Sequence, residues 1–458
     1  MSGNDGLYEK LKRHGKEGYL PMHMPGHKRN AEFLNGLPVE IDITEIEGFD
    51  NLHDMGGVLL DTSKRAAALY GAHRCYPLVN GSSAGILAAV TAATRGKGRL
   101  LMSRNCHKSA YNAAVINRLE TSYLYPKTDE TGIMGEISPE DVKTALEEHG
   151  DVTAVFITSP TFEGVVSDIQ KIAQICLEKD VPLIVDAAHG AHFGFDAGFP
   201  QNPVRQGADY VIMSLHKTLP ALTQCALLAT GKNADEELCA YALSIYETTS
   251  PSYILMAAID ECVRVMEDGS KELFYELNEN LRRFYESTRL KTLKIKHYDD
   301  PSRIVVDCSR ADVNGTQLSK ILRDEFKIEI EMAYADYAVL ITTVCDDAQS
   351  FERLSAALIE IDGRLSKKAP EPIMRIPAAA QQMPMYAAAF RKSRHISALD
   401  CEGKICAENV FAYPPGIPIA APGELITREV AQFIALAPQR GIELHGSRCS
   451  ESGEISVL

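Results

Sequence analysis

Short apolar runs alternate with amphipathic stretches through the first half of the chain. Four runs rich in Val, Ile, Leu and Met predict strands at residues 99–103, 153–158, 182–186 and 210–213. Helical periodicity lies between or beside these runs, at residues 85–94, 109–119, 139–149 and 168–179. Ser138 followed by Pro139 marks one helix start, because proline is favoured at the first helical position. The alternation is typical of an α/β protein with a parallel sheet.

The second half of the chain changes character after a long charged stretch, which predicts a helix at about 260–289. Beyond it, strands are expected at 302–307, 328–332 and 337–342, and helices at 316–325 and 348–360. Proline clusters at 369–377 and 413–422 indicate loops. We therefore expect an N-terminal arm (1–30), a large domain (31–285) and a smaller C-terminal α+β region (286–458).

Composition places the chain among soluble globular proteins. Apolar residues make up 45% and charged residues 24%, which excludes a disordered chain, a collagen and a coiled coil. The 47 Lys and Arg against 62 Asp and Glu give a net charge of −15. Such a surface repels phosphates on average, so we expect no nucleic-acid partner, whereas cationic small molecules are mildly attracted.

The N-terminal sequence and the spacing of the cysteines bear on location and on metal or redox chemistry. The first 18 residues lack an apolar signal-peptide core, and no run of 18 apolar residues occurs, so we expect a cytoplasmic protein without a membrane span. The 11 cysteines are odd in number and form no CxxC pair. This pattern supports neither a zinc ribbon nor a redox motif, and we expect no metal site. We expect reduced thiols that pack as small hydrophobic side chains.

The segment ADYVIMSLHKTLP, residues 208–220, carries the first chemical signal. A predicted strand ends in Ser214, and His216, Lys217 and Thr218 follow it. A lysine just beyond a buried strand suits a Schiff base with pyridoxal phosphate (PLP), because burial leaves the amine uncharged and nucleophilic. A surface lysine at a strand–loop junction is the alternative interpretation.

A carboxylate and a phosphate loop accompany this lysine. Asp186 ends a hydrophobic strand 31 residues earlier, where a carboxylate can keep the pyridine nitrogen of PLP protonated, and His189 follows within plausible reach of the phenolic oxygen. The alternatives are a loop-capping aspartate and an ordinary polar loop histidine. In the segment Gly81–Gly85 a strand runs through small residues into an Ala-rich helix, and Ser82 and Ser83 could bind a phosphate. Together the three elements predict a PLP site.

The chain resembles the PLP-dependent ornithine/lysine/arginine decarboxylase family, within the aspartate-aminotransferase-like (fold type I) group. Eight stretches between residues 21 and 424 carry the resemblance, in family order: His23-Met-Pro-Gly-His27-Lys28, Asp42-Ile-Thr-Glu45-Ile, Leu78-Val-Asn-Gly81-Ser-Ser83, Asn105-Cys-His107-Lys108-Ser109, Asp186-Ala-Ala-His189, Ser214-Leu-His216-Lys217-Thr218, Thr248-Thr-Ser-Pro-Ser-Tyr253 and Tyr413-Pro-Pro-Gly-Ile-Pro-Ile419 with Pro422-Gly-Glu424. The co-occurrence is specific for the family and much less so for the substrate. It implies a large domain with a mostly parallel sheet and a smaller C-terminal α/β domain.

The resemblance also implies roles for individual residues. Lys217 would bind the cofactor covalently, Asp186 would pair with the pyridine nitrogen, and His107 would stack on the ring. His189 would replace a tryptophan contact found in some large members. The phosphate would be contacted by Ser82, Ser83, Ala84, Ser214 and His216, with Thr248 reaching it from the neighbouring subunit of a homodimer or higher homo-oligomer. The chain begins almost directly at the expected arm, as in shorter members without a wing domain, so a decamer is not expected.

The expected activity is decarboxylation of a basic amino acid to CO2 and an amine that is a polyamine precursor. Glu408 could face the distal cation of the substrate, although a loop glutamate is more often solvated. Transamination on the same scaffold and a non-catalytic regulatory paralogue are the alternatives, and the intact Lys217, Asp186 and His107 argue against the paralogue. The sequence does not choose among arginine, lysine and ornithine.

Overall fold

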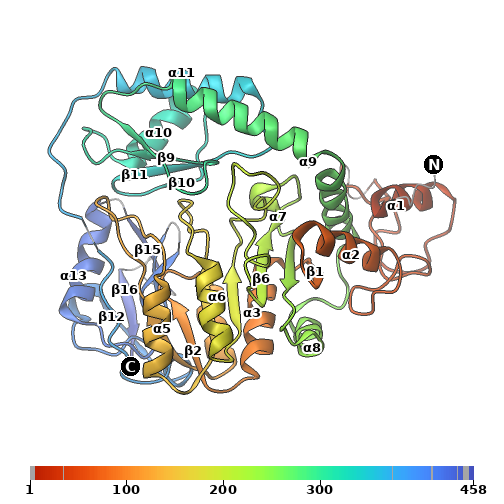
Figure 1. The fold of residues 1–458 in the computed structure, drawn as a ribbon, viewed down its shortest axis with the longest axis horizontal. Coiled ribbons are helices and arrows are strands. Elements are labelled where there is room, and N and C mark those ends of the chain that lie inside the picture. The colour runs from red at the N-terminus through yellow and green to blue at the C-terminus, as the bar shows by residue number, and fades with distance from the viewer. Residues whose placement is uncertain are drawn as a thin grey trace.

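A seven-stranded sheet runs through the middle of the molecule (Figure 1). The computed structural model describes residues 6–458 apart from 33, 35, 374, 414, 415, 441 and 447–452. The spatial order is β1-β7-β6-β5-β4-β2-β3. The bounds are β1 Arg74–Leu78, β2 Arg99–Ser103, β3 Glu120–Leu124, β4 Val152–Thr158, β5 Leu183–Asp186, β6 Tyr210–Ser214 and β7 Ala226–Thr230. Strands β2 to β6 pair in parallel, and β7 is antiparallel to β1 and β6, so the large sheet is mostly parallel as predicted.

Both faces of this sheet are buried, because successive side chains of a strand point to opposite sides. In β4, Val155 and Ile157 join one core with α2, α5, α6 and α9, whereas Ala154 and Phe156 join the other with α3, α4 and α8. The helices are α2 Val58–Tyr70, α3 Gly81–Thr94, α4 Lys108–Ile116, α5 Pro139–Glu148, α6 Ile169–Glu178, α7 Leu215–Thr218, α8 Glu236–Tyr246 and α9 Tyr253–Ser287. Strands buried on both faces explain why the sequence shows continuous apolar runs there.

The long helix α9 leads to a smaller unit, drawn at the top of Figure 1. Its antiparallel sheet has the order β10-β11-β9-β8, and α10 and α11 pack beside it. The bounds are β8 Lys294–Lys296, β9 Arg303–Asp307, α10 Gly315–Phe326, β10 Met332–Ala333, β11 Tyr337–Ile341 and α11 Ala348–Asp362. The predicted end of the large domain at residue 285 falls near the end of α9, and the three-part division stays a prediction.

The C-terminal segment forms two small sheets beside the large one (Figure 1). Its elements are α12 Met385–Ala389, β12 Arg394–Ser397, the 3-10 helix η1 Ala398–Asp400, β13 Val410–Tyr413, β14 Ile417–Ala420, α13 Arg428–Leu436, the 3-10 helix η2 Ala437–Arg440, β15 Glu443–His445 and β16 Glu454–Val457. Arg104, just after β2, forms two charge-assisted bonds to Glu424, 2.6 and 3.0 Å long. Both side chains are buried, so this ion pair joins the segment to the large domain.

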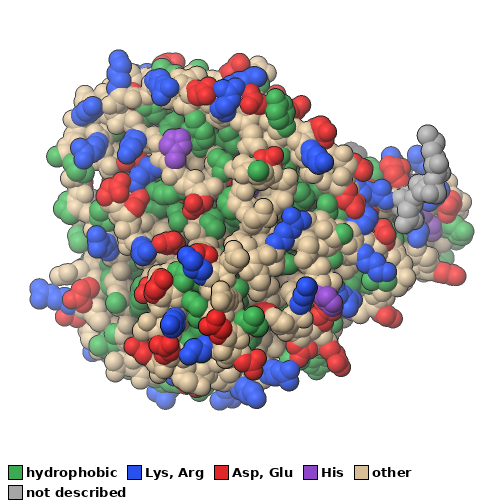
Figure 2. Space-filling model, viewed as in Figure 1, with side chains coloured by type: hydrophobic (Ala, Val, Ile, Leu, Met, Phe, Trp, Pro, Cys, Tyr) green, Lys and Arg blue, Asp and Glu red, His purple; other side chains and the backbone are tan. Residues whose placement is uncertain are grey.

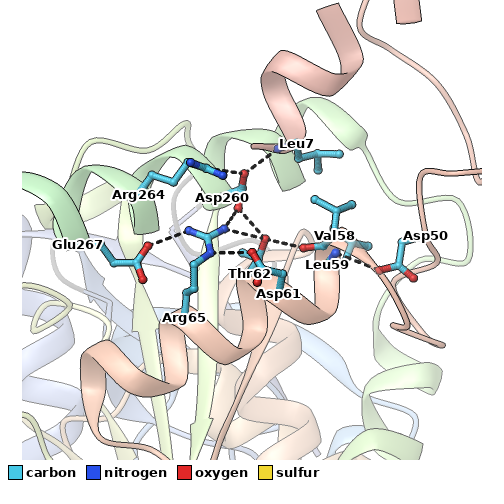
Figure 3. Close-up of polar contacts among 10 residues, drawn as sticks. All are labelled: Leu7, Asp50, Val58, Leu59, Asp61, Thr62, Arg65, Asp260, Arg264 and Glu267. Carbon is cyan, nitrogen blue, oxygen red and sulfur yellow. Dashed lines mark hydrogen bonds and ion pairs between the residues drawn. The ribbon is translucent and has the colours of Figure 1, made fainter. Parts of the chain in front are cut away.

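The N-terminal helix α1, Leu7–Lys16, is held by a buried aspartate of α9 (Figure 3). Asp260 accepts hydrogen bonds from Leu7 N at 2.8 Å and Thr62 Oγ1 at 2.7 Å, and it also contacts Arg65. Arg65 in turn pairs with Glu267 at 3.0 Å. A buried carboxylate is stable in this position because several donors satisfy it, so one residue fixes the start of α1 to α2 and α9.

Three sequence predictions need correction. The helix expected from residue 85 begins at Gly81, so Ser82 and Ser83 lie in its first turn rather than in a loop before it. The strand expected at 328–332 is wrong except at its end, because β11 pairs with residues 332 and 333 alone.

The proline cluster at 413–422 was expected to be a loop, yet it contains the end of β13 and all of β14. Pro414 and Pro415 lie outside the described residues. Helix α5, in contrast, begins at Pro139 as predicted.

The remaining features of the described residues are the surface charges and the cysteines. Lysine and arginine side chains are interspersed with aspartate and glutamate over the face in Figure 2. No helix in the described ranges is both long and apolar enough to span a bilayer. The ten described cysteines are free, and Cys345 is exposed while the other nine are buried; Cys449 lies outside the described residues.

Candidate active site

The candidate site lies at the carboxyl edge of the large sheet. Asp186 ends β5, Ser214 ends β6, and Lys217 lies in the short helix α7 that follows β6. Parallel strands present their carboxyl ends at one edge, where ligands of open α/β sheets bind. A cavity of about 560 Å³ opens there. It is lined by the predicted residues Ser82, Ser83, His107, Asp186, His189, Ser214, His216 and Lys217, and by others.

Lys217 is partly buried, and its Nζ lies 3.0 Å from His189 Nε2. Burial lowers the pKa of Lys217, Asp186 opposes this shift, and the charge of Arg303 adds to it. The amine therefore loses its proton more readily than a free lysine does, and the uncharged amine is the nucleophilic form. Lys217 is placed to attack a carbonyl carbon in the cavity.

His189 is buried beside this amine. Burial, followed by the charge of Lys217, lowers the pKa of His189 well below its usual range, so the ring is neutral. When Nε2 accepts a hydrogen bond from the Lys217 ammonium, Nδ1 carries the proton. Nδ1 has no partner within the part of the chain that the structure describes. A buried donor of this kind calls for a ligand or a water molecule to accept its hydrogen bond.

Asp186 is also buried, and its Oδ1 accepts a hydrogen bond from Ala188 N at 3.1 Å. Burial raises the pKa of Asp186, and the charge of Lys217 opposes the rise. A carboxylate held in this way gains stability from a second cation in the cavity. The protonated nitrogen of a pyridine ring is such a cation.

Hydroxyl groups gather at the amino end of α3. Ser82 Oγ lies 2.6 Å from Ser214 Oγ, and Ser109 Oγ donates to Ser83 Oγ at 3.0 Å. The 14-residue helix α3 adds free N–H groups and the positive end of its dipole. Gly81 begins the helix with φ of 73°, a conformation that other residues adopt with strain. This arrangement suits a phosphate group.

His107 caps α4, where its Nδ1 accepts a hydrogen bond from Ser109 N at 3.3 Å. Its side chain is open to the cavity, although neighbouring protein atoms replace much of its water. This desolvation and the charge of Lys217 lower the pKa of His107 to about 4, so its ring is neutral at physiological pH. A neutral imidazole is suited to stacking on an aromatic ring.

These groups together fit PLP. The amine of Lys217 suits its aldehyde, the Asp186 carboxylate suits its ring nitrogen, and the unpartnered Nδ1 of His189 suits an oxygen acceptor. The hydroxyls at the start of α3 suit its phosphate.

Other predicted residues lie away from the cavity of this chain. Ala84 is buried in the first turn of α3, behind the serines. Thr248 follows α8; its carbonyl accepts a hydrogen bond from His53 Nε2 at 2.9 Å, and its Oγ1 accepts one from Ser250 N at 3.3 Å. Glu408 is buried in the C-terminal segment, where Oε1 accepts a hydrogen bond from Ser456 N at 2.6 Å. Their roles toward cofactor and substrate stay predictions.

Two family models match the chain. The major domain of Orn/Lys/Arg decarboxylases matches residues 5–291, and the C-terminal domain of the same family matches residues 361–446. The chain belongs to the Orn/Lys/Arg decarboxylase family. It is therefore a decarboxylase by family, and PLP is the cofactor that the family implies.

Relatives and solved structures of this family agree. An arginine decarboxylase of Bacillus subtilis is 29% identical over 99% of this chain and 97% of its own length. The constitutive lysine decarboxylase of Escherichia coli is 29% identical over 51% of this chain and 35% of its own length. A structure of that E. coli protein superposes with a TM-score of 0.85 at 19% identity, covering 99% of this chain and 81% of the other.

A more distant neighbour defines the wider fold group. A ureidoglycine-glyoxylate aminotransferase of B. subtilis has a TM-score of 0.55, at 16% identity, over 67% of this chain and 84% of its own. The predicted family and the fold type I architecture are thereby confirmed.

Sequence reasoning missed several residues of this decarboxylase site. Phe162, Glu163 and Glu331 line the cavity, and Arg303 donates from Nη2 to the carbonyl oxygen of His189 at 2.8 Å. Glu331 and Arg303 come from the smaller unit, far along the chain, and no motif connects them with Lys217. The carboxylate in the stretch Thr161-Phe-Glu163 after β4 was available as a signal, because β4 adjoins β5 in the sheet.

Proposed function

We propose that this enzyme catalyses PLP-dependent decarboxylation of a basic amino acid, namely arginine, lysine or ornithine, to the corresponding amine and CO2. The observation that carries the proposal is the meeting of Lys217 and Asp186 in one cavity, with Lys217 Nζ 3.0 Å from His189 Nε2. The product would be a precursor of polyamines.

Each of the residues that line the cavity would have a separate role in the reaction. When bound, PLP supplies the conjugated system that accepts the electron pair left behind as CO2 departs. Asp186 would hold a proton at the pyridine nitrogen, which keeps that system electron-poor. Lys217 would attach the cofactor, yield its place to the substrate amine and carry a proton afterwards. Ser82, Ser83 and the start of α3 would hold the phosphate.

The neutral histidines would hold the cofactor ring in a fixed orientation. Because the pKa of His107 is lowered to about 4, its ring brings no charge next to the cofactor face. His189 would donate from Nδ1 to the phenolic oxygen, which fixes the ring relative to Asp186. Fixed orientation of the reacting bond is a large part of the catalytic effect.

Arginine is the first substrate to test. Four curated relatives that match over 91% or more of this chain are named arginine decarboxylase. Lysine decarboxylases match as well, so lysine and ornithine belong in the same assay. Transamination on this scaffold is the alternative that the assay separates.

The test measures CO2 release and the amine product from each amino acid with PLP-loaded protein. Wild type is expected to release CO2 in proportion to amine, and Lys217→Ala should lose both this activity and the borohydride-reducible cofactor bond. Lys143→Ala, an exposed lysine of α5, is the control and should keep both. A keto-acid product with the pyridoxamine form of the cofactor would instead identify a transaminase, and a PLP–protein bond retained by Lys217→Ala would refute the assignment.

A further inference from the structure

A side chamber adjoins the active-site cavity. It measures about 180 Å³, and Met134, Glu163 and Ile417 line both the chamber and the cavity, so the two spaces meet at these residues. Three tyrosines, Tyr125, Tyr334 and Tyr337, contribute to its wall. A substrate whose α-amine takes the place of the Lys217 amine can extend its side chain toward this junction.

Glu163 is a buried carboxylate at the junction. Its side chain is 4% exposed, and Oε1 accepts a hydrogen bond from the Tyr337 hydroxyl at 2.7 Å. Burial raises the pKa of Glu163, while the hydrogen bonds from Tyr337 and Thr161 oppose the rise. No Lys, Arg or His of the described ranges forms an ion pair with it. A buried carboxylate without a cation is costly, so its natural partner is a cation that comes from outside the protein.

The basic residues near the chamber do not fill this role. Arg104 lines the chamber but is engaged with Glu424 through both of its terminal nitrogens. Arg375 also lines it, yet its side chain is exposed, so water screens its charge.

Aromatic rings form part of the chamber wall. The ring centroids of Tyr334 and Tyr337 lie 5.5 Å apart, and tyrosine faces attract cations. The chamber therefore combines a carboxylate at its junction with the cavity with aromatic rings in its wall.

We propose that Glu163 binds the distal cation of the basic amino-acid substrate and so determines the selectivity of the enzyme for basic side chains. This inference rests on the proposed function. A guanidinium or ammonium group at the chamber entrance would donate hydrogen bonds to the carboxylate, whose second oxygen and remaining lone pairs can accept them. Tyr337 holds the carboxylate in position.

Glu163 also differs from Glu408 in its surroundings. Glu408 lies in the C-terminal segment and is bonded to Ser456 N, away from the cavity of its own chain. Glu163 lines the cavity that holds Lys217. Matched substitutions of Glu163 and Glu408 therefore show which of the two carboxylates determines substrate selectivity.

The experiment compares Glu163→Gln, Glu163→Asp, Glu408→Gln and Glu148→Gln in the PLP-loaded protein. Glu148 is an exposed residue of α5, so its variant controls for the loss of one charge. For each we measure kcat and KM with arginine, lysine and ornithine, and the same constants with norleucine, which lacks the terminal amine of lysine. Calorimetry gives the Kd of the product amines, and visible absorbance reports cofactor loading.

Glu163→Gln should raise KM for basic substrates, and Kd for their amines, by about tenfold or more, because a charged hydrogen-bond partner is lost. Its preference for lysine over norleucine should fall by a similar factor, with cofactor absorbance unchanged. Glu163→Asp keeps the charge and should show a smaller rise, and it also tests the proposal where the Gln variant fails to fold. Glu148→Gln should match wild type.

Unchanged KM, Kd and selectivity in the Glu163 variants would overturn the inference, as would a selectivity loss confined to Glu408→Gln. The proposed function fails separately, through absence of CO2 release from any basic amino acid by wild type. In that case the calorimetric Kd of the amines still decides the role of Glu163.

Discussion

At the residue scale, the basic groups of the site lower one another's pKa. Lys217 is close enough to His189 and His107 to lower the pKa of both imidazoles, and Arg303 lowers the pKa of Lys217 and His189. Asp186, and after it Glu331, oppose the lowering of the pKa of Lys217. The cavity therefore holds bases whose protonated forms are weakened, an environment in which a proton moves at little cost.

Asp186 should be needed for chemistry more than for folding. Its pairing with the pyridine nitrogen is worth most when negative charge flows into the ring, so it acts on the transition state. Asp186→Asn is expected to lower kcat by about 10²-fold or more, as for the loss of a strong electrostatic stabiliser. Steady-state kinetics at saturating PLP measure this effect.

The matched control is Asp180→Asn, an exposed residue after α6. It should leave kcat unchanged. Near-native kcat in Asp186→Asn, with full cofactor loading, would contradict the role of this carboxylate.

Residues in motifs could be predicted from the sequence, and residues brought in by the fold could not. Asp186 ends one strand and Lys217 follows another, both strands are recognisable as apolar runs, and their carboxyl ends meet in any parallel sheet. Glu331 comes from beside a two-residue strand in another unit. Its distance in sequence from Lys217 left no local pattern to detect.

At the element scale, one carboxylate fixes the loop that leads into α3. Glu247, just after α8, accepts hydrogen bonds from Val79 N and Asn80 N, each at 3.1 Å. These amides lie immediately before Gly81, where the phosphate site begins. The end of α8 thereby holds the amino end of α3 in place.

Glu247 should make stability depend on pH. Burial raises the pKa of Glu247 to about 7 from 4.5. Between these pH values the folded protein keeps a proton that the unfolded chain has released, so the free energy of unfolding falls as pH rises. The loss is at most about 3 kcal/mol, by the free energy of one pKa unit. Urea denaturation of wild type and Glu247→Gln at a series of pH values, at fixed PLP concentration, measures it.

Glutamine cannot ionise, so the Glu247→Gln variant should show a shallower fall in stability from pH 4.5 to 7 than wild type. Glu276→Gln, an exposed residue of α9, is the control and should follow the wild-type curve. Parallel curves for wild type and Glu247→Gln would show that Glu247 titrates normally.

Elements differed in how well the sequence predicted them. Strands β2, β4, β5 and β6 were predicted within a residue or two because their continuous apolar runs reflect burial on both faces. The alternating stretch at 328–332 has the period of a strand, but of its residues only Met332 is paired with β11. The strands of the C-terminal segment are three or four residues long, too short for a period to emerge.

At the scale of the whole molecule, the phosphate site of one chain lacks its predicted Thr248. Thr248 lies after α8, half-buried, and does not line the cavity of its own chain. Its hydrogen bond from Ser250 N is also what a simple turn would form. We propose that the working unit is at least a homodimer, in which Thr248 reaches the phosphate of the partner's cofactor.

Subunit mixing tests this shared site. Lys217→Ala and Thr248→Trp should each be inactive alone, since one cannot bind the cofactor covalently and the other blocks the phosphate. If Thr248 acts in the partner's site, a mixed dimer gathers both lesions at one site and leaves the second site native, because a two-fold interface repeats every contact. CO2 release should then reappear, approaching one active site for each mixed dimer.

A second mixture provides the control. Lys217 and Asp186 line the same cavity of one chain, so a mixture of Lys217→Ala with Asp186→Asn should contain no native site unless one of these residues crosses the interface. It should stay at the level of Asp186→Asn alone. Sedimentation and subunit exchange are measured in both mixtures, because activity can return only where chains exchange. An active wild-type monomer, or exchanged Lys217→Ala and Thr248→Trp chains that stay inactive, would rule out the shared site.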